Sequence, residues 1–149
     1  MELKVEKLEV VMVDISGSTF KDVNAQELNF ENVNLAKSQI NNANMSGWVM
    51  NDVNLSELKI TNANLSKTVI QNANLSHAVI DHVELIGTEF LNIVLPQQGD
   101  ANYSPEGQYK PIIFRNSNLS NMELIDCDIS GLKINGILIE ELLRDKEGS

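Results

Sequence analysis

Residues 42–81 read NANMSGWVMN DVNLSELKIT NANLSKTVIQ NANLSHAVID, and an apolar residue returns at every fifth position throughout them. The same spacing runs through nineteen positions from Val5 to Leu95 without a slip, and only Ala25 among these central residues is undersized. A second, usually smaller residue stands two places before most of the central residues. The sequence is therefore a tandem array of five-residue repeats.

This period excludes a long α-helix. At about 100° per residue, a five-residue step turns the apolar side chain by roughly 140° and spreads it around the helix. Two positions that lie two residues apart share one side of an extended chain, so each repeat should contain a short extended segment. The remaining residues, mostly Asn, Ser, Lys, Asp, Glu or Gly, should turn a corner, because Asn, Asp and Gly accept a left-handed backbone. The sequence predicts an all-β chain.

Several units resemble the Ala-(Asp/Asn)-Leu-x-x repeat of the pentapeptide-repeat protein family; they begin at Ala43, Val53, Ala63 and Ala73. The resemblance implies a right-handed quadrilateral parallel β-helix with four repeats per coil, one on each side. The central residues up to Leu95 and the six that follow from Phe114 would make about six coils. Such a rod would be roughly 30 Å long at about 4.8 Å per layer.

With twenty residues per coil, side chains twenty positions apart should stack in columns along the rod. The predicted core includes seven central residues: Phe30, Leu35, Leu55, Leu65, Leu75, Phe90 and Phe114. On the outside, asparagines such as Asn24 and Asn44 share a column, which predicts ladders of side-chain amides.

Trp48 departs from its inward column, in which the residues twenty positions away are Leu28 and Thr68. Either the coil accommodates the indole inside, or the ring turns outward and offers a partner an anchor. Packing fixes the inward positions of a solenoid, which favours the buried arrangement.

The repeat fails over residues 96–111, which hold all three prolines and both tyrosines, and resumes at Phe114. Proline cannot donate to a ladder between coils, so this stretch is predicted to be an exposed loop. The single domain, residues 1–149, would have repeats at about 3–95 and 112–139, with the loop inserted at one corner of a continuous rod. The loop is either a tolerated insertion or a partner-binding segment. The binding candidates are Asp100, Tyr103, Glu106 and Tyr109.

The C-terminal stretch ILIEELLRDK, residues 137–146, abandons the repeat and places two glutamates ahead of Arg144, the charge order that favours a helix. We expect a short helix at about 138–146. A solenoid must cover its last apolar layer. Three leucines are therefore predicted to cap the rod or to pair with a second copy: Leu138, Leu142 and Leu143. The resemblance implies a homodimer formed through this end.

The composition limits location and partners. The 21 acidic and 11 basic residues give a net charge of -10, which opposes direct binding to nucleic acid or to anionic lipid. No run approaches the roughly 18 apolar residues of a membrane span, and the N-terminal MELKVEK alternates in charge, so we expect a cytoplasmic protein. The single cysteine, Cys127, excludes a disulfide framework within the chain and is expected to be a small buried residue.

No pattern in the sequence indicates an enzyme. His77 and His82 fall on outward corners without a third ligand, so no metal is expected. A phosphate-binding Gly-Lys-Ser/Thr and a nucleophile elbow are absent. Because every inward position is apolar or small, the sequence predicts no interior pocket, no catalytic residue and no cofactor.

Two functions remain open. The first is a protein-interaction scaffold of unknown partner, with a solenoid face or the 96–111 loop as the contact surface. The second follows from a resemblance to Qnr-type quinolone-resistance proteins, which are acidic pentapeptide-repeat rods that mimic DNA and bind DNA gyrase. This chain shares the acidic rod, an inserted loop and a terminal helix, but it is shorter and has one insertion in place of two.

Overall fold

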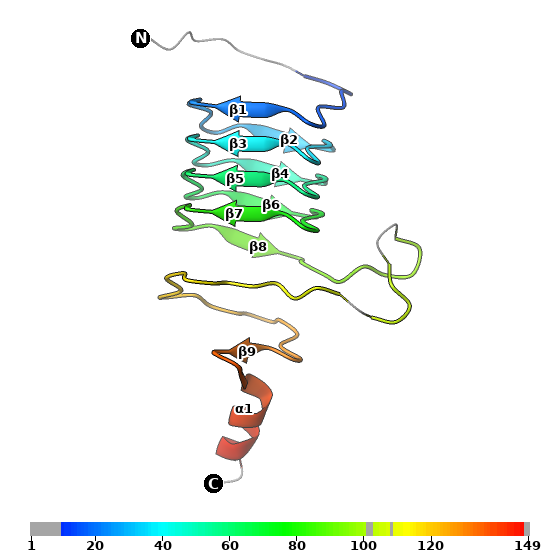
Figure 1. The fold of residues 1–149 in the computed structure, drawn as a ribbon, viewed down its shortest axis with the longest axis vertical. Coiled ribbons are helices and arrows are strands. Elements are labelled where there is room, and N and C mark those ends of the chain that lie inside the picture. Colours follow the sequence, from blue (N-terminus) through cyan, green and yellow to red (C-terminus); the bar gives the residue numbers. More distant parts are fainter. Residues whose placement is uncertain (1–9, 101–102, 108, 148–149) are drawn as a thin grey trace. The chain divides into compact units, whose positions relative to one another are not determined.

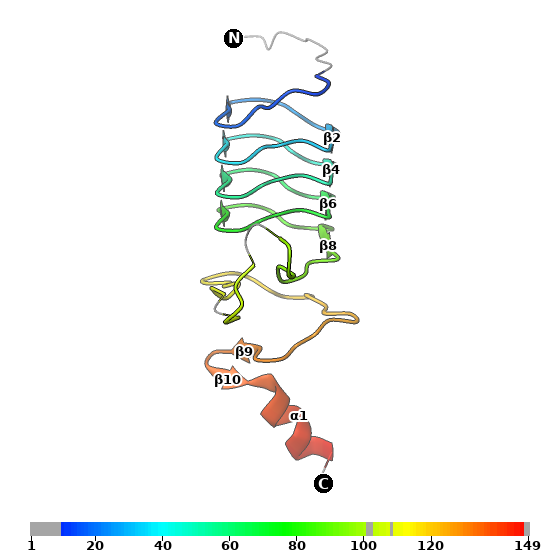
Figure 2. The ribbon, with the colours of Figure 1, turned by 90° about the vertical axis from the view of Figure 1, so that its right-hand side faces the viewer.

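The computed structural model describes residues 10–100, 103–107 and 109–147 of the chain. The chain divides into two compact units, between Pro105 and Glu106. The first unit holds strands β1 to β8, and the second holds β9, β10 and the helix α1 (Figure 1 and Figure 2).

The first unit contains eight strands of three residues each. They are β1 Thr19–Lys21, β2 Asn29–Glu31, β3 Gln39–Asn41, β4 Val49–Asn51, β5 Lys59–Thr61, β6 Val69–Gln71, β7 Val79–Asp81 and β8 Glu89–Leu91. They form two four-stranded parallel sheets, in the orders β1-β3-β5-β7 and β2-β4-β6-β8. Figure 2 shows the even-numbered strands stacked along one side.

The register of the sheets follows the repeat. Each strand pairs with the strand one coil away at a separation of twenty residues, as in Phe20↔Ile40. Isolated parallel bridges, such as Asn24↔Asn44, join the coils on the remaining sides. The first unit is therefore a four-sided parallel β-solenoid with twenty residues per coil.

The solenoid has about four turns rather than the six that the repeat count suggested. Between Leu91 and Lys133, the described residues contain no strand, although the five-residue pattern resumes at Phe114. The three prolines of the intervening segment cannot donate to a ladder, which explains why the pairing ends at β8.

A left-handed backbone marks every corner. In the first unit, φ is positive at every fifth residue from Met12 to Asn92, always two places after a central residue. Glycines occupy some of these positions, but Lys37 and His77 adopt the same conformation with φ of 61° and 59°. The stacking of the coils therefore fixes this backbone conformation even where the residue type does not favour it.

The asparagine columns act at the corners. Five Oδ1 atoms each accept a hydrogen bond from the backbone N–H two residues further on, at 2.9–3.2 Å; they belong to Asn34, Asn44, Asn54, Asn64 and Asn74. The prediction of side-chain amide ladders is thus wrong for these columns. Their side chains hold each turn in shape, and main-chain bonds join the coils, as from the Leu35 N–H to the Asn54 carbonyl at 2.8 Å.

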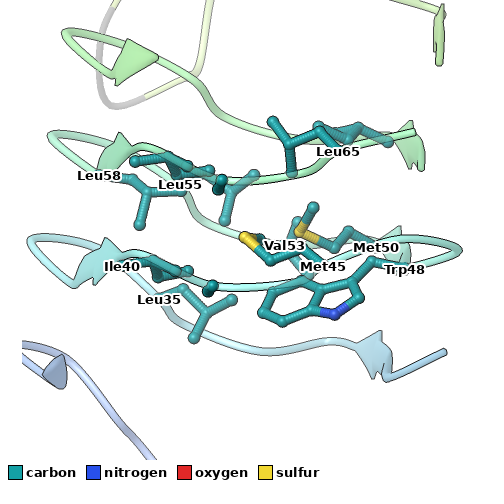
Figure 3. Packing of buried hydrophobic residues seen from close by; sticks show 13 residues of the cluster. Leu35, Ile40, Met45, Trp48, Met50, Val53, Leu55, Leu58 and Leu65 are labelled. Carbon is teal, nitrogen blue, oxygen red and sulfur yellow. The ribbon is translucent and has the colours of Figure 1, made fainter. Parts of the chain in front are cut away.

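The core fills the middle coils. Thirteen buried apolar residues pack into one cluster, which includes Leu35, Leu55 and Leu65 (Figure 3). Phe30 and Leu75 are partly buried against this cluster.

Two residues of the predicted core are exposed. Phe90 is 42% exposed, because β8 is the last strand of its sheet and only β6 stacks against it. Phe114 is 49% exposed and lies in the segment without strands, where no ladder stacks its ring.

Trp48 is buried, with 1% of its surface exposed. Its ring centroid lies 4.8 Å from that of Phe30 with the planes at 49°, and its Nε1–H donates to the carbonyl oxygen of Ala25. Ala25, the undersized central residue of the repeat, is thus the residue that the indole contacts. The buried alternative is correct.

In the second unit, β9 (Lys133–Ile134) pairs antiparallel with β10 (Ile137–Leu138), and α1 follows over Ile139–Glu147. Positive φ recurs every fifth residue from Asn116 to Gly136, so the corner geometry of the repeat continues here. Cys127 is exposed, contrary to expectation, because these repeats are not enclosed by a strand ladder.

Candidate functional site

The four residues of the predicted binding loop are divided between the two compact units. Asp100 closes a turn, since its Oδ2 accepts from the Gln97 N–H at 2.7 Å and its own N–H donates to the Gln97 carbonyl at 2.9 Å. Tyr103 is 40% exposed, Glu106 is exposed, and Tyr109 is partly buried. The first two candidates belong to one unit and the last two to the other. Their binding role stays a prediction.

The C-terminal leucines differ in burial. Leu138 ends β10 and is partly buried, whereas Leu142 and Leu143 lie on α1 and are 47% and 49% exposed. Glu140 anchors the start of the helix, because its Oε1 accepts from the Gly131 N–H at 2.6 Å and its Oε2 lies 3.8 Å from Arg144 Nη2. The homodimer through this end stays a prediction.

A shallow depression lies on one corner of the solenoid, and its lining comes from two adjacent coils: Asn62, Ala63, Asn64, His82 and Glu84. Ala63 is 4% exposed and belongs to the buried core cluster. A parallel bridge joins Asn64 to Glu84, and the Leu65 N–H donates to the Glu84 carbonyl at 2.9 Å. The main chain therefore fixes the spacing of the lining residues.

The depression contains one fixed imidazole and one unpaired carboxylate. His82 Nδ1 lies 2.9 Å from Asp81 Oδ1, so the Nδ1–H donates and a neutral ring keeps Nε2 as an acceptor. The Glu84 carboxylate has no hydrogen bond or ion pair to any residue that the structure describes. Sequence reasoning missed this site because it considered the two histidines only as metal ligands. The sequence contained a signal for the site, because His82 and Glu84 stand twenty residues after Asn62 and Asn64 and therefore stack on them in the next coil.

The acidic residues of the coils face every direction. Residues 10–95 contain nine acidic residues and four lysines. Grouped by side through the twenty-residue period, the acidic residues are Asp14 and Glu57; Asp22 and Asp81; Glu27 and Glu84; and Glu31, Asp52 and Glu89. No side is without a carboxylate.

Hydrogen bonds lower the pKa values of two carboxyl groups, those of Asp14 and Asp128. The Ser16 hydroxyl and backbone N–H donate to Asp14, and those of Ser130 donate to Asp128, which lowers the pKa of both carboxyl groups below the usual range.

Within the described residues, no three His, Cys, Asp or Glu side chains are arranged to hold a metal ion. In the same part of the chain, no helix has the length and apolarity needed to cross a bilayer.

Comparison with known proteins places the repeats in a family. The family model described as pentapeptide repeats matches residues 14–47 and 49–85 in eight copies. Solved structures that match include a pentapeptide repeat protein from the thylakoid lumen of Arabidopsis thaliana, at 16% identity, over 56% of this chain and 68% of that one, with a TM-score of 0.22. No curated protein matches the sequence. Residues 14–47 and 49–85 are therefore pentapeptide repeats, and the structure stacks them as a parallel solenoid.

Proposed function

We propose that this protein is a non-enzymatic scaffold that binds a protein partner through the outer surface of its solenoid. The observation that carries the proposal is the separation of side chains between inside and outside. The buried cluster is apolar, and every Asp, Glu, Lys and His side chain of residues 10–95 is exposed. Catalytic acids and bases depend on burial or close charge partners to shift their pKa, and these coils offer such groups no burial.

The coil ladder also suits binding. Main-chain hydrogen bonds link each coil to the next, so the side chains of the outer surface are presented in fixed columns. A surface that is already ordered loses little conformational entropy when a partner docks, which favours affinity.

Reconstitution of a complex tests the scaffold. A protein retained by the immobilised chain should be purified separately and remixed with it, and light scattering should give the mass of a stoichiometric complex. If every retained protein fails to form a complex when both components are pure, the scaffold proposal is wrong.

A second candidate is an acidic mimic of DNA that binds DNA gyrase. It is favoured by the excess of nine acidic residues over four lysines in residues 10–95. It is weakened by the spread of those carboxylates over all four sides, because a DNA-like surface presents its charge along the face that enters the binding groove. A supercoiling assay with purified gyrase, with and without a fluoroquinolone, separates the two candidates. Inhibition of supercoiling or protection from the drug favours the mimic. The absence of both effects at excess protein excludes the mimic.

A further inference from the structure

We propose that the depression lined by Asn62, Ala63, Asn64, His82 and Glu84 is a docking point for a guanidinium group, supplied by an arginine side chain of a protein partner. The inference rests on the proposed scaffold function and names one contact that the scaffold makes. It is carried by a local departure from the repeat, by the concave shape and by the unpaired charge.

Two outward columns change residue type at the depression, and the first of them also begins with a carboxylate, Asp22. Asn42 and Asn62 stand forty and twenty residues before His82, and Asn44 and Asn64 stand at the same distances before Glu84. Two outward columns of asparagine therefore end on an imidazole and a carboxylate, side by side in the same coil.

The asparagines have a structural task that Glu84 does not perform. Asn44 and Asn64 each accept a hydrogen bond from the backbone N–H two residues on, at 3.2 and 2.9 Å. Glu84 makes no such side-chain bond within the described residues. Corner formation therefore does not use the Glu84 carboxylate, which leaves it available to a ligand.

The charge of the site is negative and locally uncompensated. Glu84 lies in the depression and Asp81 lies beside it, holding the His82 ring. No lysine or arginine of the described residues forms an ion pair with either carboxylate. A cation that enters the depression therefore does not have to displace a cation of the protein.

A guanidinium fits the acceptors of this depression better than other cations do. It is planar and carries five N–H donors, which can engage a carboxylate in two parallel hydrogen bonds and still reach further acceptors. Here the further acceptors are His82 Nε2 and the amide oxygen of Asn62, which line the same depression. A lysine ammonium is a point charge and gains less from acceptors spread over two coils.

Titration with a short peptide tests the proposal. The probe is Ac-Gly-Arg-Gly-NH₂, added to the full ¹⁵N-labelled chain, and the control peptide carries citrulline, which has the same shape without the charge. We expect saturable amide shifts centred on residues 62–64 and 82–84, and at least about tenfold weaker binding of the citrulline peptide. Shifts spread evenly over the four sides, or equal binding of both peptides, would overturn the assignment.

A variant that restores the repeat separates recognition from folding. In His82→Asn/Glu84→Asn the two asparagine columns continue into the fourth coil, so we expect an unchanged or higher Tm and at least about a tenfold loss of arginine-peptide binding. Glu89→Gln removes another carboxylate from the same coil without touching the depression and should bind normally. If the double variant melts early, Glu84→Gln, which keeps the shape of the side chain, decides the matter. Undiminished binding to Glu84→Gln contradicts the proposal.

The two proposals fail in different ways. A partner that forms equally tight complexes with the native chain and with His82→Asn/Glu84→Asn leaves the scaffold intact and overturns the docking point. The absence of any reconstituted partner overturns the scaffold, whatever the peptide titration shows.

Discussion

Single side chains tie successive coils together from the inside. On one inner column, three side-chain donors reach the carbonyl oxygen of a residue 23 positions earlier: Trp48 to Ala25, Thr68 to Met45 and Thr88 to Leu65. Ser38 belongs to another column, is fully buried, and its Oγ has no hydrogen-bond partner among the described residues. Two buried hydroxyls of the same core therefore differ in whether they are satisfied.

This difference predicts opposite responses to mutation. Ser38→Ala should leave the free energy of unfolding unchanged or raise it by up to about 1 kcal/mol, because it removes an unsatisfied buried hydroxyl. Thr68→Val should lower it by about 1 kcal/mol, because it leaves the Met45 carbonyl without this donor. Urea unfolding of both variants measures the two values. An equal loss of stability in both would show that Ser38 finds a partner in solution.

The pKa of Asp128 gives a second prediction at this scale. Ser130 bonds the ionised form and lowers the pKa, so these hydrogen bonds support the corner above the ordinary carboxyl pKa and weaken as the pH falls through the lowered folded value. A carbon-detected NMR titration should place the Asp128 pKa below the ordinary range of an aspartate. Ser130→Ala should move it back toward the ordinary value, and a value that does not move contradicts this account.

Among the elements, the corners are the most uniform part of the solenoid. Gly47 and Lys67 occupy equivalent corners one coil apart, with φ of 74° and 58°. A side chain at position 47 would meet only Glu27 Cγ at 3.5 Å, which is an ordinary contact, so the backbone conformation sets the cost of substitution there.

Gly47→Ala should therefore lower the free energy of unfolding by about 1 kcal/mol, because alanine is strained at positive φ. Lys67→Ala is the matched control: position 67 already carries a Cβ in this conformation, so its stability should change by less than about 0.5 kcal/mol. Thermal melting of the two variants checks the pair. Equal losses would mean that packing, not backbone strain, dominates these corners.

In the whole molecule, the coils share one continuous core, so a charge placed in the middle should disrupt several coils. Leu65→Lys should lower the free energy of unfolding by at least about 3 kcal/mol, because Leu65 is 1% exposed and the apolar cluster offers an ammonium no partner. Asn29→Lys places the same charge on the outer surface of β2, where its ladder partner is Val49, and should melt like the native protein. Circular dichroism measures both, and native-like melting of Leu65→Lys would contradict the register.

The sequence predicts much of this solenoid because its structure is periodic. The five-residue period is enough to predict that a residue such as Ile60 faces inward. The twenty-residue period is enough to predict that it stacks on Ile40. The number of turns was harder to predict, because Phe114 and its successors keep the five-residue pattern although the described part of this segment has no parallel strand pairing. The depression was missed because its chemistry exists only between coils, where Asn62 and Glu84 meet across 22 residues of chain.

Because residues twenty apart pair in register, the solenoid can change its length by whole coils of twenty residues. Removing residues 40–59 would join Gln39 to Ile60, and each central residue that follows would still stack on a partner from its own column. The solenoid can therefore shorten or grow by gene-level deletion or duplication of whole coils, while a change of any other length shifts every later side chain to a different side. Surface features such as the depression could be moved along the axis in steps of one coil without being redesigned.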